Sequence, residues 1–237
     1  MNKLKVTTFH DLKVRLKHYY NYQKWSLLLI LLMITQAIAI SSLSPPKSTK
    51  INYQFPSPPL DQNFTSLANS LKFISSHNFT TSPQISHVIA TQRYIYESNQ
   101  GQLQIDAIYL NRGIDVAREL KPLNINYDPQ SLQPKYSSTS GHYITFTADN
   151  RAYLAACINP RGKATITSQE FIANRNRYDT SSDRLALYLL GRGDLRDNRC
   201  LLSIISIPKQ KSDPAQYQLL ENIWHLWYEY WQYHFPQ

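Results

Sequence analysis

The sequence predicts an α+β protein: an N-terminal transmembrane helix, a proline-rich stalk, and then an antiparallel β-sheet packed against helices, including a long aromatic C-terminal helix. Three observations predict this class. An apolar run without charged residues lies near the N-terminus, pairs of alternating segments flank turn sequences, and the last segment repeats tryptophan at helical spacing. An apolar run of this kind fits a bilayer, and short strands accompanied by separate helices are typical of an α+β domain.

Residues 25–43 (WSLLLILLMITQAIAISSL) contain no charged side chain. As a helix with a rise of about 1.5 Å per residue they would span roughly 28 Å, close to the hydrocarbon thickness of a bilayer. Lys24 and Trp25 stand at the start of the run, where interfacial residues are expected. We expect an uncleaved anchor, and the small residues around Ala37 and Ala39 leave a cleaved signal peptide as the alternative.

The net charge of the 237-residue chain is +9, and over half of it lies in residues 1–24, where six basic side chains face one acidic one. Such a leader holds the N-terminus in the cytoplasm, so the rest of the chain is expected in the periplasm or the thylakoid lumen. Nucleic-acid binding is not expected, because it needs positive charge concentrated on the folded part. A nucleotide or other small-molecule cofactor is not expected either, because the six glycines form no phosphate-binding loop.

Residues 44–62 form the predicted stalk, with five prolines between residues 44 and 60. Proline removes backbone donors and favours extended geometry, so this stretch is expected to be a semi-rigid spacer. The expected organisation is therefore a basic cytoplasmic leader at 1–24, an anchor at 25–43, a stalk at 44–62 and an exported domain at 63–237.

The exported domain is expected to begin with a helix and a hairpin. Apolar residues recur at helical spacing within residues 63–76, which predicts a short amphipathic helix. Residues 88–97 and 103–110 have the composition of strands, and Asn99-Gln100-Gly101 between them is a hairpin signal.

Residues 121–140 are rich in proline, serine and asparagine and are expected to form a long surface loop. A second hairpin is then predicted from strands at 142–147 and 151–158. Thr167 and Glu170 form a capping box that opens a helix, because their side chains accept hydrogen bonds from backbone N–H groups of the first turn.

Two further helices and one strand are expected in the last quarter of the chain. Ser181 or Ser182 caps a helix that ends at Gly191, and the apolar residues 200–207 form a strand. Pro214 opens a final helix, in a first turn where its missing N–H is not needed. The expected core face of that helix is an aromatic stripe formed by Tyr217, Leu220, Trp224, Trp227 and Trp231.

Cys157 and Cys200 are the only two cysteines. In an oxidising compartment they are expected to form a disulfide, with two buried free thiols as the next interpretation. A nucleophilic role for Cys157 is a weaker alternative, because no histidine stands in a catalytic signature with it. A metal site is not expected, because neither a CxxC nor an HExxH motif is present.

Arginines are concentrated in the segments around Arg161 and Arg196. Guanidinium groups match carboxylates and phosphates, so these segments are candidates for an interaction site. The favoured interpretation is that the arginines pair internally with Asp183, Asp194 and Asp197 and hold turns together.

The motifs AACINPRGKATIT, QEFIANRNRYD and DRLALYLLGRGDLRDNRCLLSIIS, followed by the tryptophan- and tyrosine-rich last segment, resemble the cyanoexosortase A system-associated proteins. These are exported, single-anchor proteins of cyanobacteria, and the resemblance runs from about Tyr143 to Phe235. The candidate interaction residues lie in these motifs: Asn159, Arg161, Gly162, Asn174, Arg175, Arg184, Arg196 and Asp197.

The resemblance implies a partner rather than a reaction. Exosortases are multi-spanning membrane transpeptidases that process proteins with a short C-terminal sorting signal, using their own cysteine, arginine and histidine. A chain with one membrane segment resembles the non-catalytic accessory of such an enzyme, which docks on or positions the enzyme or its substrates. An envelope structural or polysaccharide-binding module and a thiol-dependent enzyme are the alternatives.

Overall fold

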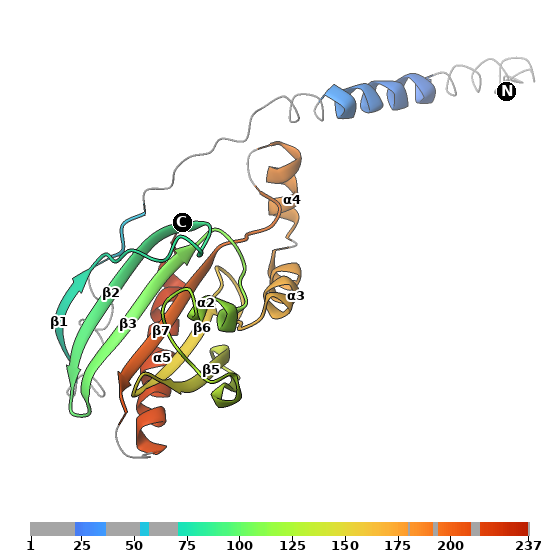
Figure 1. Ribbon diagram of the computed structural model, residues 1–237. Helices are drawn as coiled ribbons and strands as arrows, with labels where there is room; N and C mark the ends of the chain where they lie inside the picture. The colour runs from blue at the N-terminus through green and yellow to red at the C-terminus, as the bar shows by residue number, and fades with distance from the viewer. Residues whose placement is uncertain are drawn as a thin grey trace, which may run out of the picture. The chain divides into compact units, whose positions relative to one another are not determined.

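A seven-stranded antiparallel sheet with the strand order β1-β2-β3-β7-β6-β5-β4 organises the larger of two structural units (Figure 1). The larger unit comprises Lys50–Leu189 and Gly193–Gln237, and the smaller comprises Met1–Thr49 and Leu190–Arg192. The computed structural model describes residues 22–36, 53–56, 71–179, 181–191, 194–209 and 214–236. Its antiparallel sheet and separate helices confirm the α+β class.

The strands are β1 (Leu71–His77), β2 (Val88–Ser98), β3 (Gly101–Leu110), β4 (Gln133–Ser137), β5 (Gly141–Ala148), β6 (Arg151–Ile158) and β7 (Cys200–Pro208). The helices of the same unit are α2 (Val116–Leu120), the 3-10 turn η2 (Pro129–Ser131), α3 (Ser168–Tyr178), α4 (Ser182–Leu189) and α5 (Pro214–His234). Both hairpins, the helix opened by Thr167 and the final helix are confirmed. At Thr167 both hydrogen bonds of the capping box are formed.

Helix α5 packs on one face of the sheet, across β6 and β7. Its tryptophans Trp224, Trp227 and Trp231 are fully buried, which confirms that the aromatic stripe faces the core. The Trp227 indole N–H donates to Ser203 Oγ at 2.8 Å, and the Trp224 indole N–H donates to Ser140 Oγ at 3.0 Å. These bonds satisfy polar atoms that burial removes from water, so they determine how the helix is positioned on the sheet.

The first predicted helix is wrong where the structure describes it. Residues 71–77 form the edge strand β1, which pairs antiparallel with β2, and residues 63–70 lie outside the described part of the chain. The half-buried Leu71 and Phe73 alternate with the exposed Lys72 and Ile74, which is the pattern of a strand on a sheet. A short helix without tertiary contacts is only marginally stable. Pairing with β2 instead gives this segment backbone hydrogen bonds within the sheet.

The long loop predicted at 121–140 is also partly wrong. Gln133–Ser137 form β4, which pairs with β5 at the other edge of the sheet. Pro134 within it lacks a backbone donor, and an edge strand tolerates that because one side of the strand needs no partner. The composition of this segment is typical of a loop, but the segment forms a strand because β5 pairs with its backbone.

Part of the predicted stalk belongs to the folded unit. The ring of Tyr53 lies 5.2 Å from that of Tyr109, and the ring of Phe55 lies 5.8 Å from that of Trp231. The Tyr94 hydroxyl donates to the Pro56 carbonyl at 3.1 Å. The domain thus begins before residue 63, because two aromatic rings find buried partners there.

The smaller unit contains a helix at residues 22–36, whose side chains from Leu27 to Ile34 are exposed. Among the residues that the structure describes, no helix combines the length and the apolar character needed to cross a membrane. Residues 37–43 of the expected anchor lie outside those residues.

Replacing Ser203 by alanine tests how α5 is held. The Ser203→Ala change leaves the buried Trp227 N–H without its acceptor, so we expect the free energy of unfolding to fall by about 1–3 kcal/mol. Urea unfolding followed by tryptophan fluorescence measures this. The exposed Ser138→Ala is the control and is expected to stay within about 0.5 kcal/mol of the parent chain. Equal stability of the two variants would contradict the role assigned to this bond.

Candidate interaction site

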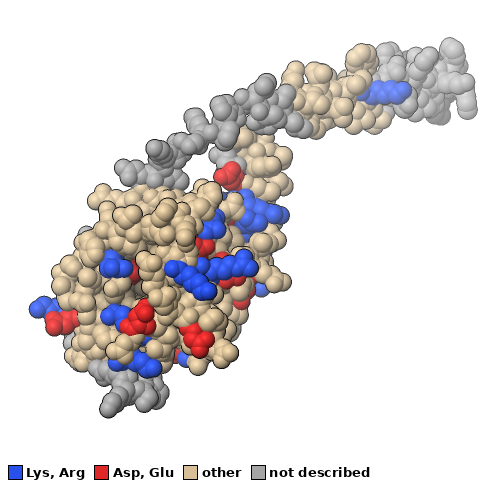
Figure 2. Space-filling view, in the orientation of Figure 1, with Lys and Arg blue, Asp and Glu red and all other residues tan. Residues whose placement is uncertain are grey.

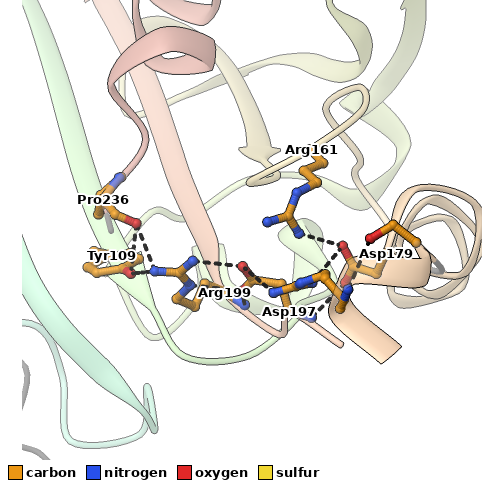
Figure 3. Close-up of polar contacts among 8 residues, drawn as sticks. Tyr109, Arg161, Asp179, Asp197, Arg199 and Pro236 are labelled. Atoms are coloured by element: carbon orange, nitrogen blue, oxygen red, sulfur yellow. Dashed lines mark hydrogen bonds and ion pairs between the residues drawn. The ribbon is translucent and has the colours of Figure 1, made fainter. Parts of the chain in front are cut away.

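Five charged side chains form an arginine–aspartate cluster at one end of the sheet: Arg161, Asp179, Arg184, Asp197 and Arg199 (Figure 3). They come from the turn after β6, the end of α3, the first turn of α4 and the segment before β7. The cluster therefore joins four separate segments between residues 161 and 199.

Asp179 accepts hydrogen bonds from Arg161 and from a backbone N–H, and it forms an ion pair with Arg184. Its Oδ1 lies 2.9 Å from Arg161 Nη1 and 3.1 Å from Arg184 Nη1, and its Oδ2 accepts from the Asp197 backbone N–H at 2.6 Å. The residue is only 3% exposed. A buried carboxylate needs such compensation, and these contacts fix α4 and the segment before β7 to the end of α3.

Asp197 and Arg199 form a bidentate pair. Arg199 Nε lies 2.8 Å from Asp197 Oδ1, and Arg199 Nη2 lies 2.7 Å from Oδ2. The remaining Arg199 nitrogen, Nη1, donates to the Pro236 carbonyl at 2.9 Å and to the Tyr109 hydroxyl at 3.2 Å. One guanidinium thus connects β3, the segment before β7 and the residues that follow α5.

Burial would by itself raise the pKa of Asp197. The hydrogen bonds and the charge of Arg199, together with the charge of Arg184, outweigh that effect and hold the pKa of this carboxyl below its ordinary value. The hydrogen bond from Arg199 to Asp197 also raises the pKa of the guanidinium. Both groups are therefore charged at neutral pH, and each stabilises the charge of the other.

The turn after β6 depends on a glycine and an asparagine. The Asn174 side chain donates to the Arg161 carbonyl at 2.7 Å and accepts from the Lys163 backbone N–H at 3.2 Å. Gly162 has φ +72°, and a Cβ at this position would lie 2.3 Å from Asn174 Oδ1. Any other residue would displace the side chain that holds the turn, so Gly162 and Asn174 position Arg161.

Asn159 is a buried part of the same turn. Its Nδ2 donates to the Lys163 carbonyl at 2.6 Å and to Thr165 Oγ1 at 3.3 Å. Its backbone carbonyl accepts from Gln232 of α5 at 3.4 Å. The residue is 2% exposed, so it is a structural support and does not offer a surface for contact.

The two remaining arginines of the candidate set lie outside the cluster. Arg175 donates through Nη1 to Asn198 Oδ1 and lies over the ring of Phe171. Arg196 is exposed, and its side chain makes no ion pair with any residue that the structure describes. Of the eight predicted interaction residues, Arg196 is the one whose charged group is most available to a partner.

Cys157 and Cys200 are joined in a disulfide between β6 and β7, with their Cα atoms 5.7 Å apart. Both residues are fully buried. A nucleophile must be a free and accessible thiol, and Cys157 is neither. The bond holds the turn after β6 beside the segment before β7, where the cluster forms.

The arginines of the cluster pair with aspartates of the same domain, as expected, but not every aspartate partner is an expected one. Asp197 pairs with Arg184 and Arg199, whereas Arg161 pairs with Asp179, which the sequence interpretation did not select. The spacing of Asp197 and Arg199 is a local signal for their pairing. No local signal links Arg161 to a helix end eighteen positions later, because tertiary packing creates that contact.

Comparison with family models, with curated proteins and with solved structures finds no match to this chain. Within the described ranges, no group of three or more histidine, cysteine, aspartate or glutamate side chains is arranged to hold a metal ion. The motif resemblance therefore remains an inference from the residues themselves.

Replacing Asp197 by asparagine tests the buried pair. Asp197→Asn removes the charge that Arg199 and Arg184 face, so we expect the free energy of unfolding to fall by about 2–3 kcal/mol at pH 7. The exposed Asp194→Asn is the control and should change stability little.

The same pair makes the difference depend on pH. The pKa of Asp197 is lower in the folded protein than its ordinary value, so its contribution is fully present above the unfolded pKa of about 3.9 and is lost as the pH falls through the folded pKa. Urea unfolding at a series of pH values should therefore show the parent chain and Asp197→Asn converging in acid. A difference that persists unchanged far below pH 4 would show that the charge of Asp197 is not its cause.

Removing the disulfide tests the cross-link. Its cysteines lie 43 positions apart, and in the chain-entropy model a loop of this length contributes about 3–4 kcal/mol. We expect Cys157→Ala, Cys200→Ala and the double variant to lose similar stability in urea unfolding, since each removes the same bond. A double variant as stable as the parent, or an intact mass without the loss of two hydrogens, would exclude the bond.

Proposed function

We propose that this chain is a membrane-anchored, non-catalytic accessory of a cyanobacterial exosortase. In this proposal the N-terminus is cytoplasmic, residues 25–43 cross the membrane once, and the domain faces the periplasm or the thylakoid lumen. The domain docks on the transpeptidase, or positions its substrates, through the surface around the arginine–aspartate cluster.

The convergence of the motif residues carries the proposal. Arg161 lies in the turn after β6, and Asn174 of α3 holds that turn. Asp197 and Arg199 come from the segment before β7, more than twenty positions after Asn174, and lie in the same cluster. Cys157 and Cys200 cross-link the strands that support both segments. The motifs that resemble the exosortase-associated family thus build one structural feature, which is what a common docking surface requires.

The proposed location rests on two independent features of the chain. A disulfide between two buried cysteines is typical of an oxidising compartment outside the cytoplasm. Residues 25–43 carry no charge and follow a basic leader, which is typical of a single span with a cytoplasmic N-terminus. An exported domain on a single span can contact a multi-spanning enzyme in the same membrane.

The chemistry of the site favours binding over reaction. Asp179 and Asp197 are each neutralised by arginines and are almost completely buried, so neither is placed to exchange a proton with a substrate. Arg196, in contrast, presents a guanidinium to solvent beside the cluster. A guanidinium group binds a carboxylate of a protein partner through two parallel hydrogen bonds.

Charge reversal at Arg196 tests the docking surface. The full-length chain, co-expressed with the exosortase and captured in mild detergent, should retain the enzyme. We expect Arg196→Glu to lower the retained enzyme about tenfold, which corresponds to about 1.4 kcal/mol of binding free energy. Lys72→Glu is the matched control, because it makes the same charge change at an exposed position of the edge strand β1.

Two results would overturn the proposal. The first is a parent chain that repeatedly fails to capture the exosortase from membranes. The second is normal processing of sorted proteins in cells from which the gene has been deleted. If Arg196→Glu and Lys72→Glu retain the enzyme equally while the parent binds it, the accessory role stands and the docking surface lies elsewhere.

A further inference from the structure

Helix α4 is apolar and uncovered. All its residues from Leu185 to Leu189 are apolar or aromatic, and each of them is exposed. Leu185, Leu187, Tyr188 and Leu189 are 48%, 46%, 52% and 68% exposed, respectively. A helix that is apolar around most of its circumference is normally buried in protein or lipid, and α4 lies against no other helix or strand of the described chain over more than a few residues.

The first turn of α4 is nevertheless rigidly attached. Arg184 lies 3.1 Å from Asp179 and 3.8 Å from Asp197, so the cluster fixes the start of the helix to the domain. Beyond this turn the helix projects past the end of the sheet (Figure 1). The exposed leucines are therefore held out from the domain in a defined direction.

The chain enters the domain at this same end. Tyr53 packs on Tyr109, whose hydroxyl accepts from Arg199, and Arg199 pairs with Asp197 of the cluster that holds α4. Figure 1 shows the 53–56 stretch, the end of α5 and α4 at one end of the larger unit. The β2–β3 hairpin lies at the opposite end.

The reach of the chain between the predicted anchor and Tyr53 is short. Tyr53 follows Leu43 by ten positions, which extend to at most about 36 Å. A folded domain of this size has a diameter of roughly 40 Å. In the proposed function Tyr53 therefore stays within about 36 Å of the end of the anchor, so the end of the domain that carries Tyr53 and α4 can reach the leaflet.

The charge around α4 complements an anionic leaflet. Residues 161–199 carry eight basic side chains against five acidic ones. Figure 2 shows lysine and arginine side chains at the base of α4 and an acidic side chain beside it, while most of the helix itself is uncharged. Apolar side chains with a basic flank are the composition of helices that lie in a membrane interface, and eight residues are too few to span one.

We infer that α4 is a second membrane contact, which inserts Leu185, Tyr188 and Leu189 into the interface of an anionic phospholipid leaflet. The inference rests on the anchor in the proposed function, because the anchor brings this end of the domain to the membrane. The contact orients the domain, so that the surface around Arg196 is held at a constant height above the leaflet.

A fluorescent label reports the insertion in the full-length chain. Leu189→Cys is labelled with an environment-sensitive dye without reductant, which leaves the Cys157–Cys200 bond intact. The chain is reconstituted into vesicles of phosphatidylglycerol and phosphatidylcholine with a nitroxide on the acyl chains. Gln102→Cys is the matched control, because it is exposed and lies seven positions along β3 from Tyr109, about 23 Å away.

We expect blue-shifted emission from the label at 189 and quenching of about half of its intensity by the nitroxide lipid, with little effect at 102. A label at 189 that stays in water as fully as the label at 102 overturns the inference. A blue shift that grows with protein concentration and is not quenched by nitroxide lipid also overturns it, because a second copy of the chain would then cover the helix.

Extraction at alkaline pH separates this inference from the proposed function. If the chain resists extraction while the label at 189 is in water, the anchor stands and the inference fails. If the chain is extracted, the anchor fails, and the inference that rests on it fails with it. Leu185→Ser combined with Leu189→Ser should abolish the blue shift of a label at Tyr188→Cys while the disulfide and helix content stay unchanged.

Discussion

The buried pair between Asp197 and Arg199 is the contact on which this end of the protein depends. A buried ion pair is stabilising only when its geometry is good and its other hydrogen-bonding atoms are satisfied. Both conditions hold, since the pair is bidentate and the remaining Arg199 nitrogen reaches Tyr109 and Pro236. Without it, the segment before β7 and the residues that follow α5 would lose their common point of attachment.

The disulfide and the packing of the core determine where the Asp197–Arg199 pair forms. Cys157 and Cys200 cross-link β6 to β7 just where both strands leave the sheet, so the turn carrying Arg161 and the segment carrying Asp197 begin side by side. On the other face of the sheet, the hydrogen bond from Trp227 to a buried serine positions α5, whose end supplies the carbonyl that Arg199 needs. A polar cluster at the surface is thus ordered by an apolar core and one covalent bond.

The same arrangement makes the two ends of the domain different. The entry of the chain at Tyr53, the cluster and the apolar helix α4 all lie at one end of the larger unit. In the proposed function a short connection keeps one end of the domain near the membrane, and that end carries the uncovered leucines of α4. For an accessory of an integral membrane enzyme, a fixed orientation matters because it limits which part of the partner the domain can meet.

Local physical rules were enough to predict much of this structure from the sequence. The two hairpins, the capping box at Thr167 and the helix opened by Pro214 follow from the residues within each element, and the tryptophan stripe follows from helical spacing. Tertiary structure alone decided β1, β4, the packing of Tyr53 and the pairing of Arg161 with Asp179. Those outcomes depend on partners distant in sequence, whose backbone hydrogen bonds, aromatic surfaces and charges outweigh the weak preferences of short polar segments.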